Sequence, residues 1–408
     1  MAIETLTFGC RLNTVESEAL RVHAAADGRD RVVVNTCAVT QEAGRQARKA
    51  IRRIARERPG TEIVVTGCGA EVETEAYAAM PEVSRLVGNA EKLSPAGWSP
   101  TGTGPGAVMA ARTIAPTRID SVTGHTRAFV PVQNGCDHRC TFCIIPFGRG
   151  ASRSVPVPDV VAQVQTIVAH GGREVVLTGV DLTAYGRDLP GPSVSLGTLA
   201  RAILRAVPDL ARLRISSIDS VEVDDALLAV LAEEERLMPH LHLSLQAGDD
   251  LILKRMKRRH SRADAIRFCE TVRDLRPDVV FGADLIAGFP TETEDQFTRS
   301  LDLVMECGLT HLHVFPYSPR PGTPAARMPP VAADVIRDRA ARLREAGAHA
   351  LRRHLDGQVG RALTVLAERG GTGRSADFTV VRLGGEFEAG TFHTVSIAGH
   401  DGARLIAA

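Results

Sequence analysis

Three of the eight cysteines in the chain lie within eight residues of one another, at Cys136, Cys140 and Cys143, and are called here the loop trio. A structural zinc site usually needs four ligands, and a cubane iron–sulfur cluster normally takes four thiolates. Three neighbouring thiolates would hold such a cluster and leave one iron open for a substrate or cofactor. The alternative is a zinc knuckle that uses His138 as its fourth ligand. The iron–sulfur cluster is favoured because the motif lies where the first strand of a predicted barrel meets its catalytic face.

A second group of three cysteines, Cys10, Cys37 and Cys68, is dispersed along the sequence and is called here the strand trio. Each cysteine follows a short apolar run that predicts a β-strand, at residues 6–8, 32–34 and 63–65. A parallel α/β sheet built from such strands brings their carboxyl ends to one edge. The strand trio is therefore expected to form a second cluster, although a single cysteine is more often a packing residue.

Two asparagines lie near the strand trio in sequence, and two cysteines remain outside both trios. Asn13 and Asn35 are candidates for hydrogen bonds to cluster sulfurs, with turn or cap roles as the alternative. Cys269 lies in a helical stretch, and Cys307 lies at a helix end. Neither cysteine has a nearby partner, so both are predicted to be packing residues.

The bulk composition limits the class of protein. A chain of 408 residues is too long for one ordinary domain, and 44% hydrophobic content predicts packed cores. No apolar run reaches the roughly 18 residues of a membrane-spanning helix, and no secretory signal is recognisable. A cytoplasmic protein without a membrane partner is expected, in which clustered thiols indicate metal binding. The formal net charge of +1 does not by itself indicate a nucleic-acid partner.

The elements that must position the cysteines predict an α/β protein of three domains. Residues 1–95 are expected to form a parallel α/β sheet domain, and residues 96–124 a linker rich in Pro and Gly. Residues 125–353 predict a partial (β/α)6 barrel with its site at the strand carboxyl ends, and residues 354–408 a small β-barrel. The expected strands are 129–133, 174–179, 213–218, 240–246, 281–287 and 311–317, then 362–367, 378–383, 392–397 and 403–406, with a helix at 335–355 between the two sets.

The motifs around both trios resemble those of a known family. The loop trio and residues 144–150 (IIPFGRG) resemble the signature of the radical S-adenosylmethionine (SAM) methylthiotransferases. Residues 9–13 (GCRLN), 35–40 (NTCAVT) and 66–68 (TGC) are similar to its N-terminal motifs. Further matches lie at 177–181, 214–217, 244–248, 286–290 and 315–318, in the family's order. Residues 9–13 and 317–325 look most like the bacterial branch that acts on N6-threonylcarbamoyladenosine 37 of tRNA.

This resemblance implies an enzyme with two 4Fe-4S clusters that methylthiolates C2 of that adenosine. The loop-trio cluster would bind SAM at its open iron and, given an electron, cleave it to a 5′-deoxyadenosyl radical. The strand-trio cluster would supply the sulfur, and a second SAM the methyl group. Carbon C2 is not acidic, so acid–base catalysis could not activate it. The implied partners are tRNA, SAM and an electron donor.

The resemblance and the strand ends together indicate residues that contact SAM. Phe142 could pack on the adenine ring of SAM, or instead pack at the barrel mouth. Asp181, Ser216 and Gln246 end later strands and are candidates for the ribose and methionine parts. Asp284 also lies in a late strand, but it could equally be a buried structural acid, and it is assigned no role.

Three basic clusters favour RNA as the macromolecular partner. They are a helix face with Arg45, Arg48, Lys49, Arg52, Arg53 and Arg56, the run 254–260, and the run 352–354. Each alone is more often a solvated face, but together with a small barrel similar to the RNA-binding TRAM domain they favour tRNA. Arg48 and Arg52 are expected to face away from the core. Two alternatives stay open: a methylthiotransferase for another tRNA adenosine or a protein residue, and a non-catalytic metal-containing RNA-binding protein.

Overall fold

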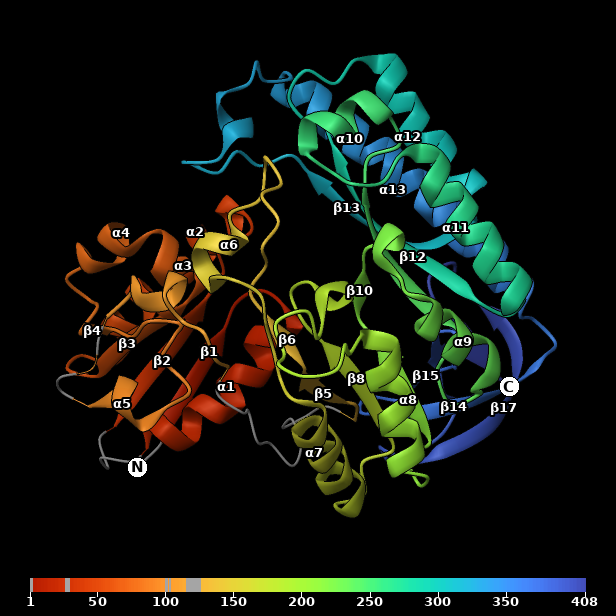
Figure 1. Cartoon of the computed structure of the whole chain (residues 1–408), viewed down its shortest axis with the longest axis horizontal. Coiled ribbons are helices and arrows are strands. Elements are labelled where there is room, and N and C mark those ends of the chain that lie inside the picture. Colours follow the sequence, from red (N-terminus) through yellow and green to blue (C-terminus); the bar gives the residue numbers. More distant parts are fainter. Residues whose placement is uncertain (1–2, 26–29, 100–101, 103, 115–125) are drawn as a thin grey trace.

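Runs of branched apolar residues form the parallel strands of the N-terminal sheet (Figure 1). The computed structural model describes residues 3–25, 30–99, 102, 104–114 and 126–408. The strands are β1 (Ile3–Thr7), β2 (Arg31–Thr36), β3 (Glu62–Gly67) and β4 (Arg85–Leu86), in that order and all parallel. Successive side chains of a strand point to opposite faces, so α1 (Arg11–Ala24) covers one face and α2 (Gln41–Glu57) the other. Cys10, Cys37 and Cys68 follow β1, β2 and β3 at the carboxyl edge.

The expected linker is largely packed where it is described. Its first residues continue into α5 (Pro95–Trp98), and a short 3-10 turn, η1, spans Ala107–Met109. Trp98 is buried against the sheet, where its indole Nε1 donates to the carbonyl of Lys92 at 2.8 Å, and Val108 is buried as well. The segment between the two domains is therefore packed in this part, because Trp98 fills a place on the sheet face. Residues 100, 101, 103 and 115–124 lie outside the described part.

The central domain is the expected partial barrel of parallel strands. One sheet has the order β5-β8-β9, with β5 (Ala128–Pro131), β8 (Glu174–Thr178) and β9 (Arg212–Ile215). The other has the order β10-β11-β12-β13, with β10 (Ser217–Ile218), β11 (His240–Gln246), β12 (Val280–Ala287) and β13 (Leu309–Pro316). The expected strand 213–218 is thus interrupted at Ser216.

Amphipathic helices cover the outside of these strands and supply the main core. They are α7 (Val157–Ala169), α8 (Leu196–Ala206), α9 (Asp225–Glu233), α11 (Arg262–Leu275), α12 (Glu294–Glu306) and α13 (Ala333–Asp356). Because all strands run parallel, their carboxyl ends share one edge of the barrel, as a ligand site in this architecture requires. No described helix has the length and apolar character needed to cross a membrane.

The C-terminal strands close into a small barrel of order β14-β15-β16-β18-β17. They are β14 (Ala362–Glu368), β15 (Thr372–Arg374), β16 (Val380–Arg382), β17 (Phe392–His400) and β18 (Leu405–Ala407). Strand β15 was not expected, since its sequence, Thr-Gly-Arg, carries no apolar alternation. Buried Arg212 donates to the carbonyls of Thr364 and Arg374, and buried Arg214 to those of Ser375 and Ala376, so β9 holds the small barrel in place.

Candidate active site

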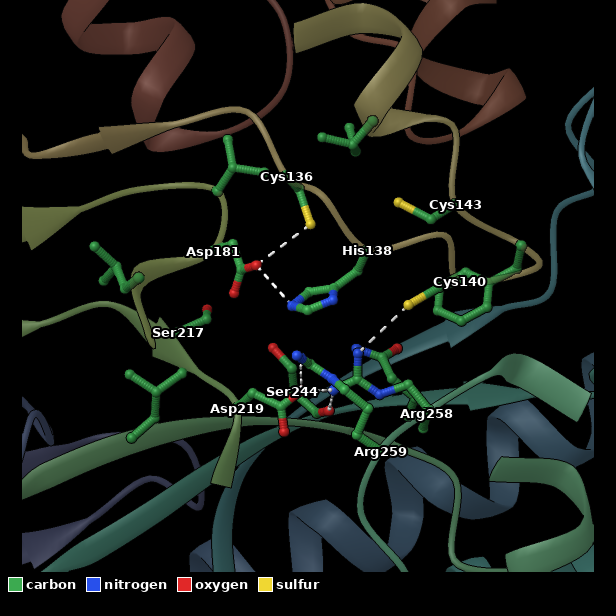
Figure 2. Close-up of a pocket in the computed structure, with 16 residues that line it drawn as sticks. Cys136, His138, Cys140, Cys143, Asp181, Ser217, Asp219, Ser244, Arg258 and Arg259 are labelled. Carbon is green, nitrogen blue, oxygen red and sulfur yellow. Dashed lines mark hydrogen bonds and ion pairs between the residues drawn. The ribbon is translucent and has the colours of Figure 1, made fainter. Parts of the chain in front are cut away.

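The loop trio lines one pocket at the carboxyl edge of the partial barrel (Figure 2). The cysteines follow β6 (Gln133–Asn134) and precede α6 (Ile145–Arg149), so a single loop presents all three. Gly135 permits this loop, because its φ is +76° and a Cβ there would lie 1.9 Å from the carbonyl oxygen of Ala151. The pocket is open to solvent on one side and has a volume of about 170 Å³.

The three thiols sit in surroundings that suit metal ligation. Burial raises the pKa of Cys143 to about 11, and burial together with the Asp181 carboxylate raises the pKa of Cys136 further. Arg258 lies on the other side, with Nη1 at 3.7 Å from the Cys140 Sγ. Buried thiols lose their protons when a metal replaces them, and a nearby guanidinium stabilises the anionic thiolates that result.

His138 is poorly placed to be the fourth ligand of a zinc knuckle. Its Nε2 lies 2.9 Å from the Asp181 carboxylate and 3.6 Å from that of Glu222. Hydrogen bonds to these two carboxylates raise the pKa of His138 to about 9, so the imidazole is protonated at neutral pH. Cys136, His138 and Asp181 do offer ligand atoms within 4.8 Å of one another, but His138 would have to lose its proton and its pairing with Glu222 before it could coordinate a metal.

Three of the four residues predicted to contact SAM line the pocket. Asp181 follows β8, and Gln133 accepts from its backbone N–H at 2.8 Å. Gln246 ends β11 with a left-handed φ of 69°. Phe142 also packs edge-to-face on Phe289, with ring centroids 6.4 Å apart, so it occupies the barrel mouth as well as the pocket wall.

Ser216 is the exception, and two other serines take its place. It lies at the break between β9 and β10, where its backbone N–H donates to the carbonyl of Leu177. The pocket is lined instead by Ser217, the next residue, and by Ser244 of β11. Neighbouring residues of an extended chain face opposite ways, so an error of one position moves the hydroxyl out of the pocket.

Sequence reasoning missed two arginines of the pocket. Arg258 and Arg259 belong to the basic run 254–260 that was expected to contact RNA, yet both line the pocket (Figure 2). The helix α10 (Asp250–Met256) ends at Lys257 in the left-handed region, which turns the chain inward. Arg258 then pairs with Asp219 at 2.8 Å and donates to the carbonyl of Ser244 at 2.7 Å. The sequence did not predict this turn, because the residue in the left-handed region is a lysine and not the glycine that usually marks such a position.

The strand trio lies at the edge of the N-terminal sheet, close to the same signature loop. A Cβ on Gly9 would lie 2.8 Å from the Cys37 Sγ, and one on Gly148 would lie 3.1 Å from the Cys68 Cβ. Burial raises the pKa of Cys37 to about 11, with Cys68 and Cys10 adding further to the increase. Cys37 and Cys68 are buried, whereas Cys10 is exposed.

A buried ionic network on Arg149 joins the two trios. Arg149 ends α6, six residues after Cys143, and its guanidinium donates to Glu16 at 2.9 Å and to Asn13 at 2.5 Å. Lys92 also binds Glu16, at 2.6 Å. Burial alone would raise the pKa of Glu16, but Arg149 and Lys92 outweigh it and lower the pKa to about 2. This network fixes α6 between the sheet and the barrel.

The two asparagines near the strand trio bind backbone and polar side chains. Asn13 donates to the carbonyls of Phe8 and Thr36, and Asn35 donates to the carbonyl of Asn13 and the hydroxyl of Ser17. Turn and scaffold roles therefore describe both residues, and the side chain that does approach a sulfur of this trio is Asn89, with Nδ2 at 3.8 Å from the Cys68 Sγ.

Comparison with known proteins places the chain in a family. Residues 130–304 match the model of the radical SAM superfamily, and residues 2–88 match the model described as "Uncharacterized protein family UPF0004". The chain is 48% identical to the threonylcarbamoyladenosine tRNA methylthiotransferase MtaB of Rickettsia prowazekii, over 93% of this chain and 91% of that protein. It is 36% identical to the tRNA-2-methylthio-N(6)-dimethylallyladenosine synthase of Novosphingobium aromaticivorans, over 96% and 93%.

The chain belongs to the radical SAM tRNA methylthiotransferases. Among solved structures it resembles the radical SAM methyltransferase TsrM of Kitasatospora setae, with a TM-score of 0.55, 17% identity, and 76% of this chain and 66% of that one covered. That likeness concerns the fold alone. Membership in the family implies SAM and a 4Fe-4S cluster. The pocket residues fit them, since three thiols face a space that also holds the polar side chains of Asp181, Ser244 and Gln246.

The remaining pair of cysteines corrects one expectation about this methylthiotransferase. Cys269 on α11 and Cys307 at the end of α12 are both fully buried in the barrel core, as packing residues would be. The prediction that neither has a nearby partner is wrong, because the two thiols lie close together and Cys307 raises the pKa of Cys269. Residues 38 apart in sequence meet here because α11 and α12 are neighbouring helices.

The basic faces expected to bind RNA are only partly free. Arg48 pairs with Glu73 at 2.6 Å and lies over the ring of Tyr77, so it supports the domain rather than facing only water. Lys49, Arg52 and Arg56 of α2 are exposed. In the third cluster His354 pairs with Asp377 at 3.0 Å, and Arg353 is exposed.

Proposed function

We propose that this protein inserts a methylthio group at C2 of N6-threonylcarbamoyladenosine 37 in tRNA. The observation that carries the proposal is the arrangement of two cysteine trios on either side of α6, joined by the buried network of Arg149 and Glu16. One trio suits radical generation and the other suits sulfur delivery. The higher identity to the threonylcarbamoyladenosine enzyme, 48% against 36% for the dimethylallyladenosine enzyme, supports the choice of base.

In this proposal Cys136, Cys140 and Cys143 hold the cluster that binds SAM, and Cys10, Cys37 and Cys68 hold a second 4Fe-4S cluster. When bound, the first cluster and SAM supply a carbon radical, which is what a non-acidic C–H bond requires. The protein supplies position and electrostatics. Arg258, beside Cys140 and paired with Asp219, stabilises the anionic thiolates of the first trio.

The polar residues of the pocket orient SAM. Asp181 follows β8 in one sheet of the partial barrel and Gln246 ends β11 in the other, and both line the pocket, so their side chains suit the ribose hydroxyls and the methionine part. Ser217 replaces Ser216 in this role. Phe142 offers a flat apolar surface for adenine, and its edge-to-face contact with Phe289 holds the ring in position.

The partners follow from the same proposal. The exposed stripe Lys49, Arg52 and Arg56 on α2 binds tRNA phosphates, and an anticodon loop presents base 37 unpaired. A cytoplasmic electron donor delivers the electron at the loop-trio pocket.

Nucleoside mass spectrometry of tRNA tests this function. Cells that lack the protein should lose 2-methylthio-N6-threonylcarbamoyladenosine and accumulate its unmethylthiolated precursor, while 2-methylthio-isopentenyladenosine stays unchanged. A Cys269→Ala form should restore the nucleoside, and a Cys37→Ala form should not. Loss of the isopentenyl product instead would assign the other adenosine.

Chemical analysis of the purified protein tests the second cluster. Anaerobically reconstituted protein should hold about eight irons and a matching amount of acid-labile sulfide, four per cluster. Zinc without labile sulfide would mean a non-catalytic RNA-binding protein instead.

A further inference from the structure

One guanidinium beside the strand trio has no ionic partner. Arg11 follows Cys10 directly and is the first residue of α1, and its side chain is exposed. Its guanidinium lies 5.7 Å from the ring centroids of both Phe129 on β5 and Phe378 in the small barrel. Among the described residues none forms a salt bridge or hydrogen bond with it, and Asp284 is the carboxylate whose charge acts on it from further away. Arg11 therefore projects into the junction of all three domains with its donors free.

The surroundings of Arg11 carry an excess of positive charge. Arg127, Arg214 and Arg374 lie within 5.2 Å of the same Phe378 ring. These three arginines share two carboxylates, Glu174 and Glu368. Arg127 and Arg214 are like charges close to Arg11, and Asp284 is the nearby charge of opposite sign. An unpaired cation among other cations gains more from an anionic ligand than an isolated surface arginine does.

A polar group on the barrel wall adjoins this cation. The Oδ1 atom of Asp284 on β12 lies 2.8 Å from His242 Nε2 and 3.2 Å from His313 Nδ1. A Cβ at Gly282 would lie 2.5 Å from the His242 ring, so glycine makes room for it. His242 and Ser244 are two residues apart on β11 and share a face, and Ser244 lines the SAM pocket. His242, Asp284 and His313 thus lie on the inner wall of the barrel, next to the pocket that the loop trio lines.

The position of the reacting base connects these observations. Carbon C2 must lie between the radical source in the loop-trio pocket and the sulfur on the strand trio. On adenine C2 and C6 flank N1, so the substituent on N6 lies at the same edge of the ring as C2. Whatever recognises that substituent must then be close to the sulfur-bearing cysteines. Arg11 is adjacent to Cys10 and meets this condition.

We propose that Arg11 binds the carboxylate of the substituent on N6, and that Asp284, on the opposite side, accepts from the N–H groups of its ureido link. This inference rests on the proposed function and names the residue that selects the substrate. A guanidinium suits a carboxylate because it offers two parallel N–H donors. An aliphatic N6 substituent lacks the carboxylate and would leave Arg11 unpaired in this cationic junction, which disfavours it.

The contact between Arg11 and the carboxylate is tested by changing the protein and the substrate separately and then together. The substrates are two anticodon stem-loops, one with N6-threonylcarbamoyladenosine and one with its carboxylate converted to the amide. The wild type should bind and turn over the amide about 10- to 100-fold less efficiently, mostly through a higher KM, as for one charge-assisted bidentate contact. Arg11→Gln should lose the same factor on the natural loop and show no further loss on the amide. Arg11→Lys should recover part of the preference.

Two matched variants separate this role from structural damage. Arg21→Gln lies on the same helix, where the side chain pairs with Glu18, and should leave the preference for carboxylate over amide intact. Asp284→Asn should weaken both stem-loops equally, since it contacts the ureido link and not the carboxylate. Stem-loop Kd values give a readout independent of turnover.

The outcomes are distinct. An unaltered preference in Arg11→Gln, or an equal loss of activity on every substrate, would overturn the subsite. His242, Asp284 and His313 also offer ligand atoms within 4.8 Å, so one tightly bound divalent metal lost in Asp284→Asn would make them a metal centre and would overturn the ureido contact. A wild type that methylthiolates only isopentenyladenosine would instead reject the proposed function itself.

Discussion

The two cysteine trios reach the same end of the molecule by different routes. The loop trio comes from one short segment, and its order along the chain nearly specifies its place in space. The strand trio comes from three strand ends and exists only once the N-terminal sheet has formed. Each trio has an arginine near it, Arg258 beside Cys140 and Arg149 near Cys68 and Cys10. The difference therefore lies in assembly: a local motif needs only its own loop, whereas a dispersed site depends on the fold that gathers it.

The largest effect is expected from breaking the loop trio. Cys140→Ala should lower reconstituted iron from about eight to about four per chain and abolish SAM cleavage, because this trio generates the radical. Iron analysis and detection of 5′-deoxyadenosine measure both. Cys269→Ala is the matched control and should retain both, being a core cysteine away from the pocket. Full SAM cleavage by Cys140→Ala would reject the assignment.

Breaking the strand trio should separate the two reactions. Cys37→Ala should still cleave SAM but yield no methylthiolated nucleoside, because the proposed function assigns sulfur delivery to this trio. Mass spectrometry of the product and of 5′-deoxyadenosine from one reaction gives the comparison. Normal amounts of product would reduce the strand trio to a structural role.

The next largest effect is expected from breaking the buried ionic network between the two trios. Glu16→Gln leaves Arg149 and Lys92 buried with one neutral partner, and should lower the stability of the N-terminal domain by about 3–5 kcal/mol. The folded-state pKa of Glu16 is about 2, below its ordinary value of 4.5. Its contribution is therefore present above about pH 4.5 and lost as the pH falls toward 2.

Thermal unfolding over that pH range checks this prediction. The variant should lose stability at neutral pH and show a flatter acid dependence than the wild type. Equal curves for the two proteins would mean that the ionic network does not join the domains.

The smallest effect is expected on the RNA surface. Lys49→Glu with Arg52→Glu should weaken tRNA binding and lower the magnitude of the log–log salt slope by about 1 for each lost phosphate contact. Exposed Arg205 and Arg344, changed to Glu together, provide a control on other helices. Arg48 is unsuitable for such a test because it is paired with Glu73. An unchanged slope would move the docking surface away from α2.

The sequence was most informative where a signal is local. Apolar runs identified β1 to β3 of the sheet and the strands of the partial barrel. Cysteine spacing identified the loop trio, and the positions of cysteines after predicted strands identified the strand trio. It failed where the outcome depends on distant contacts or on a single residue of register. The chain turns inward after Lys257 and places Arg258 in the pocket. Because the strand is interrupted at Ser216, Ser217 lines the pocket instead of Ser216. Trp98 is buried in a segment whose sequence predicts a linker. None of these three outcomes has a periodic signature.

The way the small barrel is attached also affects how freely its sequence can change. Arg212 and Arg214 bind four main-chain carbonyls of that barrel, at residues 364, 374, 375 and 376, rather than its side chains. Main-chain carbonyls are the same for every amino acid, so a substitution at any of these positions keeps its acceptor if the backbone keeps its path. The outer surface of the barrel can therefore change in sequence without loosening its attachment to the enzyme.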